Sequence, residues 1–105
     1  MLATVNRLIH RANELSDPFI SIALADYLGT LERVLGPDHP NTLTSRNNLA
    51  AAYRHQGRHL DALRAFEEGA SSAERLFGPA HQVTRQIVAN RDAARRLIAE
   101  GGNNR

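Results

Sequence analysis

The chain repeats itself at an offset of 42 residues, and this repeat limits the possible folds more than any other feature. The segment 35–40 returns as 77–82, and ten of the 23 positions from 32 to 54 are identical 42 residues later. One further step backwards aligns Asn6 with Asn48, in a much weaker copy. The 105 residues therefore hold about two and a half units, which are expected to stack on one another as a single domain over 1–105.

Each unit has the pattern of two helices. Residues 58–77 carry one apolar stripe at steps of three and four residues, and residues 19–35 carry another. Gly36-Pro37 and Gly78-Pro79 follow these stripes, where glycine caps a helix and proline stops it. We expect an all-α helical-repeat solenoid of five antiparallel helices over about 2–15, 18–35, 40–56, 59–77 and 82–100. The units would cover about 1–35, 36–77 and 78–100, with a frayed tail over 101–105.

Composition excludes several classes of protein. Cys and Lys are absent, so the sequence offers no thiolate nucleophile, no Cys-ligated metal and no phosphate-binding loop with its lysine. His55 and His59 have a possible metal spacing, but Gly57 between them is expected to end the helix. We therefore expect no enzyme, no cofactor and no metal. No apolar run reaches the length of a membrane span, and polar residues interrupt residues 1–15 where a signal peptide would be continuous, so we expect a cytoplasmic protein.

The middle unit resembles the tetratricopeptide repeat. The matching residues are Leu49-Ala50-x-x-Tyr53, then Gly57, then Ala62-x-x-x-Phe66. The 42-residue length, the helix Asn47-Asn48-Leu49-Ala50-Ala51-Ala52-Tyr53 and the loop Gly36-Pro37-Asp38-His39-Pro40 are similar to the kinesin-light-chain type. This resemblance implies a right-handed superhelical stack in which the first helix of each pair lines a concave groove that binds extended peptides.

Helical spacing then suggests which residues face such a groove. Asn6, Asn48 and Asn90 occupy one repeat position, and each amide can pair with both sides of a peptide bond. Arg54 and Arg96 occupy another and suit an acidic side chain or a C-terminal carboxylate. The same asparagines could instead fix the stacking of helices, and the arginines could be solvated or paired within the chain. The candidate peptide-binding residues are Asn6, Asn47, Asn48, Ala51, Arg54, His55, Asn90 and Arg96.

The function that follows is a non-catalytic protein–protein interaction module with a peptide or partner segment in its groove. One alternative is a piece or capping segment of a longer array, such as a regulatory sensor, with no ligand of its own. Another is weak nucleic-acid binding by a basic last helix that carries Arg85, Arg91, Arg95 and Arg96, with Arg105 beyond it, although no aromatic residues for base stacking accompany them. Apolar residues such as Phe19 and Ile22 lie off the main stripes and predict weak self-association through residues 1–28.

Overall fold

The computed structural model describes residues 17–101, and every regular element in this range is an α-helix. The prediction of helices is confirmed to within one residue at every helix end in this range. The expected helix over 2–15 lies outside the described residues, so four of the five expected helices are seen. They are α3 (Pro18–Leu35), α4 (Pro40–His55), α5 (His59–Phe77) and α6 (Gln82–Ala99).

Local sequence explains where the helices begin and end. The carboxylate of Asp17 accepts a hydrogen bond from the backbone N–H of Phe19 and caps α3. The imidazole Nδ1 atoms of His39 and His81 accept from the second residue of α4 and of α6 in the same way. The two histidines of the loops are thus helix caps at equivalent positions of successive units.

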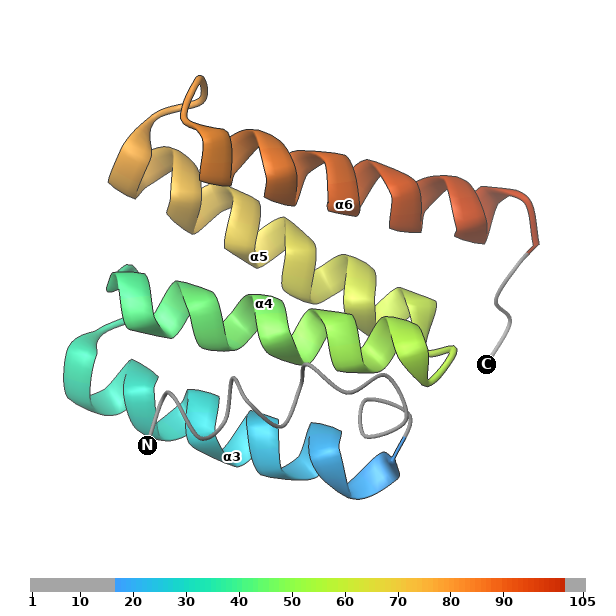
Figure 1. Ribbon diagram of the computed structural model, residues 1–105, viewed down its shortest axis with the longest axis horizontal. Helices are drawn as coiled ribbons and strands as arrows, with labels where there is room; N and C mark the ends of the chain where they lie inside the picture. The colour runs from blue at the N-terminus through green and yellow to red at the C-terminus, as the bar shows by residue number, and fades with distance from the viewer. Residues whose placement is uncertain (1–16, 102–105) are drawn as a thin grey trace.

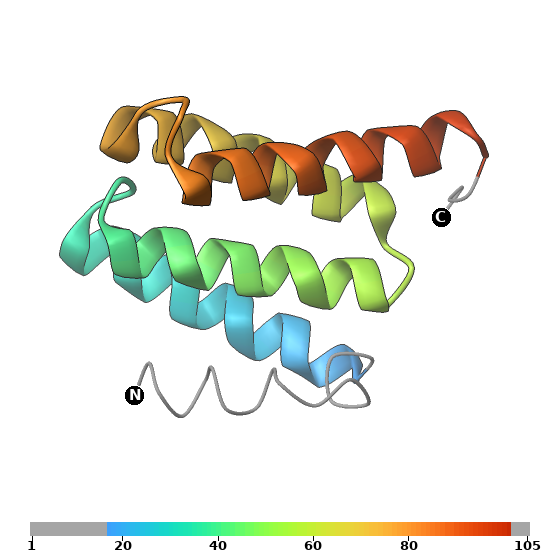
Figure 2. The ribbon, with the colours of Figure 1, turned by 45° about the horizontal axis from the view of Figure 1, so that its top comes forward.

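The helices stack in chain order, each one packed against the next (Figure 1). Figure 2 shows that α4 lies in front of α3 and α6 in front of α5. The first helices of successive units, α4 and α6, therefore form one layer, and α3 and α5 form the other. This arrangement is the helical-repeat stack that the 42-residue period predicts.

Small and large residues alternate in the core between these layers. Ala50 of α4 and Ala62 of α5 are fully buried and let the two helices approach closely. Phe66 fills the remaining space and is almost fully buried, while Tyr53 packs against the clusters on both sides of α4. These four residues belong to the repeat pattern of the sequence, and all four contribute to the core.

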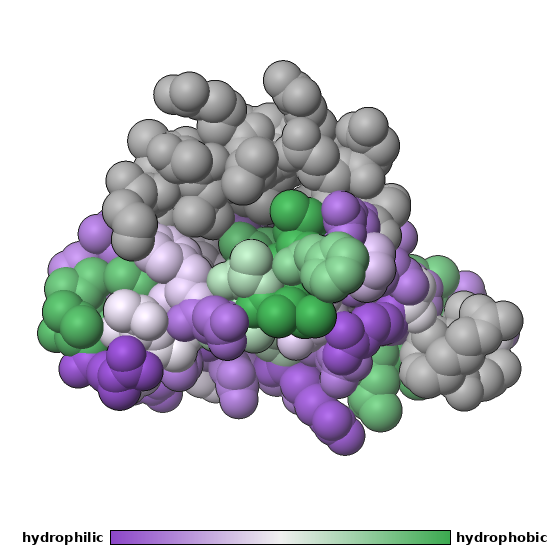
Figure 3. Space-filling view, turned by 90° about the horizontal axis from the view of Figure 1, so that it is seen from below, coloured by the Kyte–Doolittle hydropathy of each residue, from purple (hydrophilic) through white to green (hydrophobic). Residues whose placement is uncertain are grey.

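The outer side of α3 exposes apolar residues, as the sequence predicts. Phe19 is 73% exposed and Ile22 is 58% exposed. Figure 3 looks onto the side of the molecule where α3 lies and shows apolar residues gathered in the middle, with hydrophilic residues to either side and below. None of the four described helices combines the length and the apolar character that crossing a membrane requires.

Candidate functional site

A groove of about 270 Å³ lies between α4 and α6, with α5 beneath it. Five of the residues proposed from the sequence meet there, because α4 and α6 present facing stripes at steps of three and four residues. From α4 come Asn47, Asn48, Ala51 and Arg54, and from α6 comes Asn90. The remaining lining residues are Thr44, Phe66, Val83, Gln86 and Ile87.

The asparagine side chains on the groove walls differ in whether they already have hydrogen-bond partners within the protein. Asn90 has no polar partner among the described residues, and the amide oxygen of Asn47 is buried without one. Asn48, in contrast, already has a polar partner within the protein. The asparagines of the groove are therefore not equivalent, and Asn47 and Asn90 are the two with hydrogen-bonding capacity left for a ligand.

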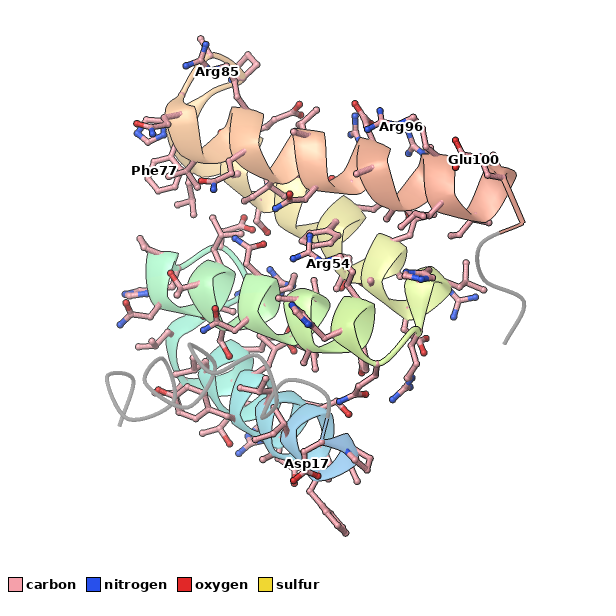
Figure 4. All side chains as sticks on the ribbon, turned by 45° about the vertical axis from the view of Figure 1, so that its right-hand side comes forward. Asp17, Arg54, Phe77, Arg85, Arg96 and Glu100 are labelled. Atoms are coloured by element: carbon pink, nitrogen blue, oxygen red, sulfur yellow. The ribbon has the colours of Figure 1, made fainter. Side chains whose placement is uncertain are left out.

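Arg54 supplies the charge of the groove. It is the one charged residue among the described residues that line the groove, and no described carboxylate lies within ion-pairing distance of it. Figure 4 shows its side chain in the space between α4 and α6. A bound group that carried negative charge would find an unpaired guanidinium there.

The floor of the groove is apolar. Phe66 rises from α5, and Val83 and Ile87 contribute from α6. Since Phe66 and Ile87 also belong to the main core cluster, the floor is part of the packed interior and does not need to rearrange to exist. The site thus combines a rigid apolar floor with amide walls and one positive charge.

Three of the sequence-derived site residues do not join this groove. Arg96 lies on the outer side of α6 and borders a separate shallow depression with Asp92, Arg95 and Ala99 (Figure 4). Arg54 and Arg96 therefore do not share one groove in this structure, since Arg54 lines the groove between α4 and α6 whereas Arg96, one unit later, borders a different surface of α6. His55 is exposed at the end of α4 and does not line the groove, and Asn6 lies outside the described residues.

A polar network on the other side of α4 was not predicted from the sequence. The guanidinium of Arg46, only 4% exposed, donates to the carboxylate of Glu32 on α3 at 2.7 Å and reaches Ser72 on α5 at 3.4 Å. Asp38 in the connecting loop accepts from Ser72 at 3.0 Å and from both Nε and Nη2 of Arg75 at 2.8 Å. Together these residues tie α3, α4, α5 and the intervening loop to one another.

Within this network, Arg75 has the largest effect on the pKa of the Asp38 carboxyl group. Its hydrogen bonds to the Asp38 carboxylate hold the pKa of Asp38 below its ordinary value. Desolvation of the carboxylate opposes this effect, and the hydrogen bond from the hydroxyl of Ser72 adds to it. The same contact raises the pKa of Arg75. Asp38 is replaced by Ala80 in the next unit, and Arg46 by Val88, so the network is specific to one repeat.

The basic residues of α6 are only partly available. Arg95 pairs with Glu67 of α5 at 3.1 Å, and Arg91 pairs with Asp92 at 3.1 Å. Arg85 and Arg96 have no ion-pair partner among the described residues. Two of the four arginines proposed to contact phosphates on this helix are thus neutralised by neighbouring carboxylates.

Helix geometry also separates His55 and His59, the pair with a possible metal spacing. α4 ends at His55 and α5 begins at His59, with a positive φ of 78° at Gly57 between them. Within residues 17–101, no three His, Asp or Glu side chains are grouped so as to hold a metal ion.

Part of this sequence is similar to known proteins. A family model described as tetratricopeptide repeat matches residues 22–75, which run from α3 to near the end of α5. The clustered mitochondria protein homolog of Aspergillus clavatus is 38% identical over 45 residues, which is 43% of this chain but only 4% of that protein. No solved structure matches the chain significantly. Since the family model covers half of the sequence and the helices stack as its repeats require, the chain belongs to the tetratricopeptide-repeat family.

Proposed function

We propose that the groove between α4 and α6 binds an extended segment of a partner protein. Tetratricopeptide repeats are in general non-catalytic modules of protein–protein interaction, so a protein partner follows from the family. The groove as the place of binding rests on one observation above all. It brings unpaired amides, an unpaired arginine and an apolar floor together in one hollow between two repeat units.

The lining suggests the chemistry of the bound segment. Amide groups on both walls suit the carbonyl and N–H groups of a peptide backbone, whatever its side chains. The apolar floor around Phe66 suits one apolar side chain, and Arg54 suits an acidic side chain or a terminal carboxylate. A short extended segment with an apolar residue near an acidic one is the ligand we propose.

The finer type of repeat belongs to the same proposal. The 42-residue period, the Asn-Asn-Leu-Ala-x-x-Tyr helix of α4 and the loop that ends in the capping His39 support a kinesin-light-chain type. The residues that carry this resemblance also build the groove, because Asn47 and Asn48 are both on its wall.

A peptide array probed with the purified 105-residue chain tests the function. The expected hits are peptides with an acidic residue close to an apolar one, with binding that weakens as salt is raised. Arg54→Gln is expected to abolish the preference for the acidic residue. Arg96→Gln removes the repeat-equivalent charge outside the groove and serves as the matched control. Equal losses from both variants, or no hits at all, would contradict the proposal.

A second candidate function is that of a segment of a longer repeat array with no ligand of its own. The chain spans only 4% of the length of the relative that it matches, which supports the idea that such units occur inside much larger proteins. In that case the isolated chain would bind no peptide, although it would still fold.

Self-association through residues 1–28 is a further part of the proposal for partners. The exposure of Phe19 and Ile22 supports it, although residues 1–16 lie outside the described part of the chain. Light scattering over a concentration series tests it, with Phe19→Ser as the variant expected to stay monomeric. A monomer at every concentration would refute it.

Weak nucleic-acid binding through α6 has less support, since Arg91 and Arg95 are already paired with carboxylates. Filter binding at two salt concentrations tests it, because phosphate contacts lose affinity steeply with salt. The cytoplasmic location expected from the sequence stays a prediction.

A further inference from the structure

Gly69 lies in the middle of α5 directly beneath the groove, and its missing side chain leaves room for two groove residues. A Cβ atom built at Gly69 would come within 3.0 Å of Oδ1 of Asn47 and 3.5 Å of Cγ2 of Ile87. Only the first distance is shorter than ordinary van der Waals contact. Tyr27 stands at the equivalent position one unit earlier, so the repeat as such does not demand glycine here.

The amide of Asn47 has one enclosed atom and one open atom. Its Oδ1 is buried and has no hydrogen-bond partner among the described residues, whereas Nδ2 is not enclosed in this way. Because Asn47 lines the groove, Nδ2 is the atom that its amide presents there. In this orientation one acceptor is buried without a partner, which makes the alternative orientation of the amide the relevant comparison.

Gly69 leaves the space that this oxygen occupies, because a Cβ atom there would come within 3.0 Å of Oδ1. If the amide turned over, its NH₂ group would lie in this space and would bury two donors in place of one acceptor. The oxygen is therefore kept inside and the NH₂ group outside.

We propose that Gly69 is a positioning residue of the groove that makes Asn47 a dedicated hydrogen-bond donor. This inference rests on the proposed function and adds the polarity of one contact to it. The group opposite Asn47 must be an acceptor, such as a backbone carbonyl or a carboxylate oxygen of the bound segment, and cannot be an N–H group. With Arg54 on the same helix, this wall of the groove offers donors to oxygen atoms.

A mutant cycle without ligand tests the link between the two residues. Gly29 of α3 is the matched control, because it is also inside a helix and a Cβ there meets nothing within 4 Å. Gly29→Ala is expected to raise the Tm by roughly 4 °C or more through helix propensity alone. Gly69→Ala is expected to raise it less or to lower it, and to regain the full increase when Asn47 is also changed to Ala.

Binding of one peptide taken from the array tests the donor role. Asn47→Ala is expected to weaken binding about 2- to 10-fold, the effect of one neutral hydrogen bond. Asn47→Asp is expected to weaken it further, because a carboxylate repels an acceptor, and Gly69→Ala is expected to weaken it while Gly29→Ala does not.

The outcomes separate this inference from the proposed function. If Gly69→Ala stabilises the wild-type chain as much as Gly29→Ala does and leaves peptide binding unchanged, Gly69 has no positioning role, although the groove can still bind peptides. If Asn47→Asp binds as tightly as the wild type, Asn47 is not a donor. A wild-type chain that binds no peptide overturns the proposed function and the donor role together, while the unfolding cycle still decides whether Gly69 and Asn47 are coupled.

Discussion

Removal of Glu32 should destabilise the protein more than removal of its buried partner Arg46. Glu32 is 42% exposed and can be hydrated when it is alone, whereas Arg46 is 4% exposed and cannot. Breaking a buried ion pair is costly when a charge is left without compensation, and is cheap when the buried charge itself is replaced by an apolar group. The order of the two effects therefore follows from which partner stays behind.

The structure limits the size of the effect. A broken buried pair typically costs about 3–5 kcal/mol. After Glu32→Ala, Arg46 would keep two long hydrogen bonds of 3.4 Å and the carboxylate of Glu68 at 3.8 Å, so the expected cost is lower, about 2–3 kcal/mol. Arg46→Met keeps most of the apolar stem and leaves only hydrated carboxylates, so about 0–1 kcal/mol is expected.

Urea and thermal unfolding followed by circular dichroism measure these differences. At roughly 4–8 °C per kcal/mol, Glu32→Ala should lower the Tm by at least about 8 °C. Glu74 is the repeat equivalent of Glu32 and has no ion pair among the described residues, so Glu74→Ala should change stability by less than about 0.5 kcal/mol. The reasoning fails if Glu32→Ala is as mild as Glu74→Ala, or if Arg46→Met is the more damaging change.

Three other substitutions test separate parts of the structure. Hydrogen bonds from Arg75 lower the pKa of Asp38, so its ionised carboxylate stabilises the folded state at pH values above the ordinary aspartate pKa of about 4. This stabilisation is lost as the pH falls through the lowered pKa, so in a pH series of melting curves the difference in Tm between wild type and Asp38→Asn should shrink below about pH 4. Asn90→Ala should change the free energy of unfolding by less than about 0.5 kcal/mol and weaken peptide binding several-fold in a fluorescence titration. Unfolding of this variant would show instead that the residue is structural. Phe66→Ala should cost about 3–5 kcal/mol in a urea titration, because it empties both the core and the floor of the groove, and a loss below 1 kcal/mol would contradict the packing described here.

Most of the fold could be predicted because its signals are local. The stripe that ends at Phe77, the glycine after it and the proline that follows mark one helix end within a few residues of sequence. The positive φ of 92° at Gly36 and 86° at Gly78 shows that both loops use glycine as the sequence predicts. The 42-residue offset then fixes which helices are equivalent and therefore how they stack.

The sequence predicted part of the site, and the differences between that prediction and the structure have physical causes. Asn47, Asn48, Ala51 and Arg54 could be placed together because they share one helix face. Arg96 could not be excluded by spacing alone, since the faces that meet across a groove depend on how successive helices are packed.

The network around Arg46 was missed for a related reason. Its contacts to Glu32 and Ser72 join residues 14 and 26 positions apart on three helices, and no periodicity links them. Its one sequence signal was that Arg46 interrupts the apolar positions of α4 where Val88 continues those of α6. A buried charge in an otherwise apolar stripe indicates a partner, without saying which residue it is.

Titration of the ¹⁵N-labelled chain with a peptide from the array, followed by NMR chemical-shift mapping, shows directly where a partner segment binds. If the groove between α4 and α6 is the binding site, the shifts will concentrate on residues 44–54 and 83–90, with the side-chain amides of Asn47 and Asn90 among them. Shifts confined to the outer side of α6 around Arg96, or to the outer side of α3 around Phe19, would place binding elsewhere and contradict the proposed function.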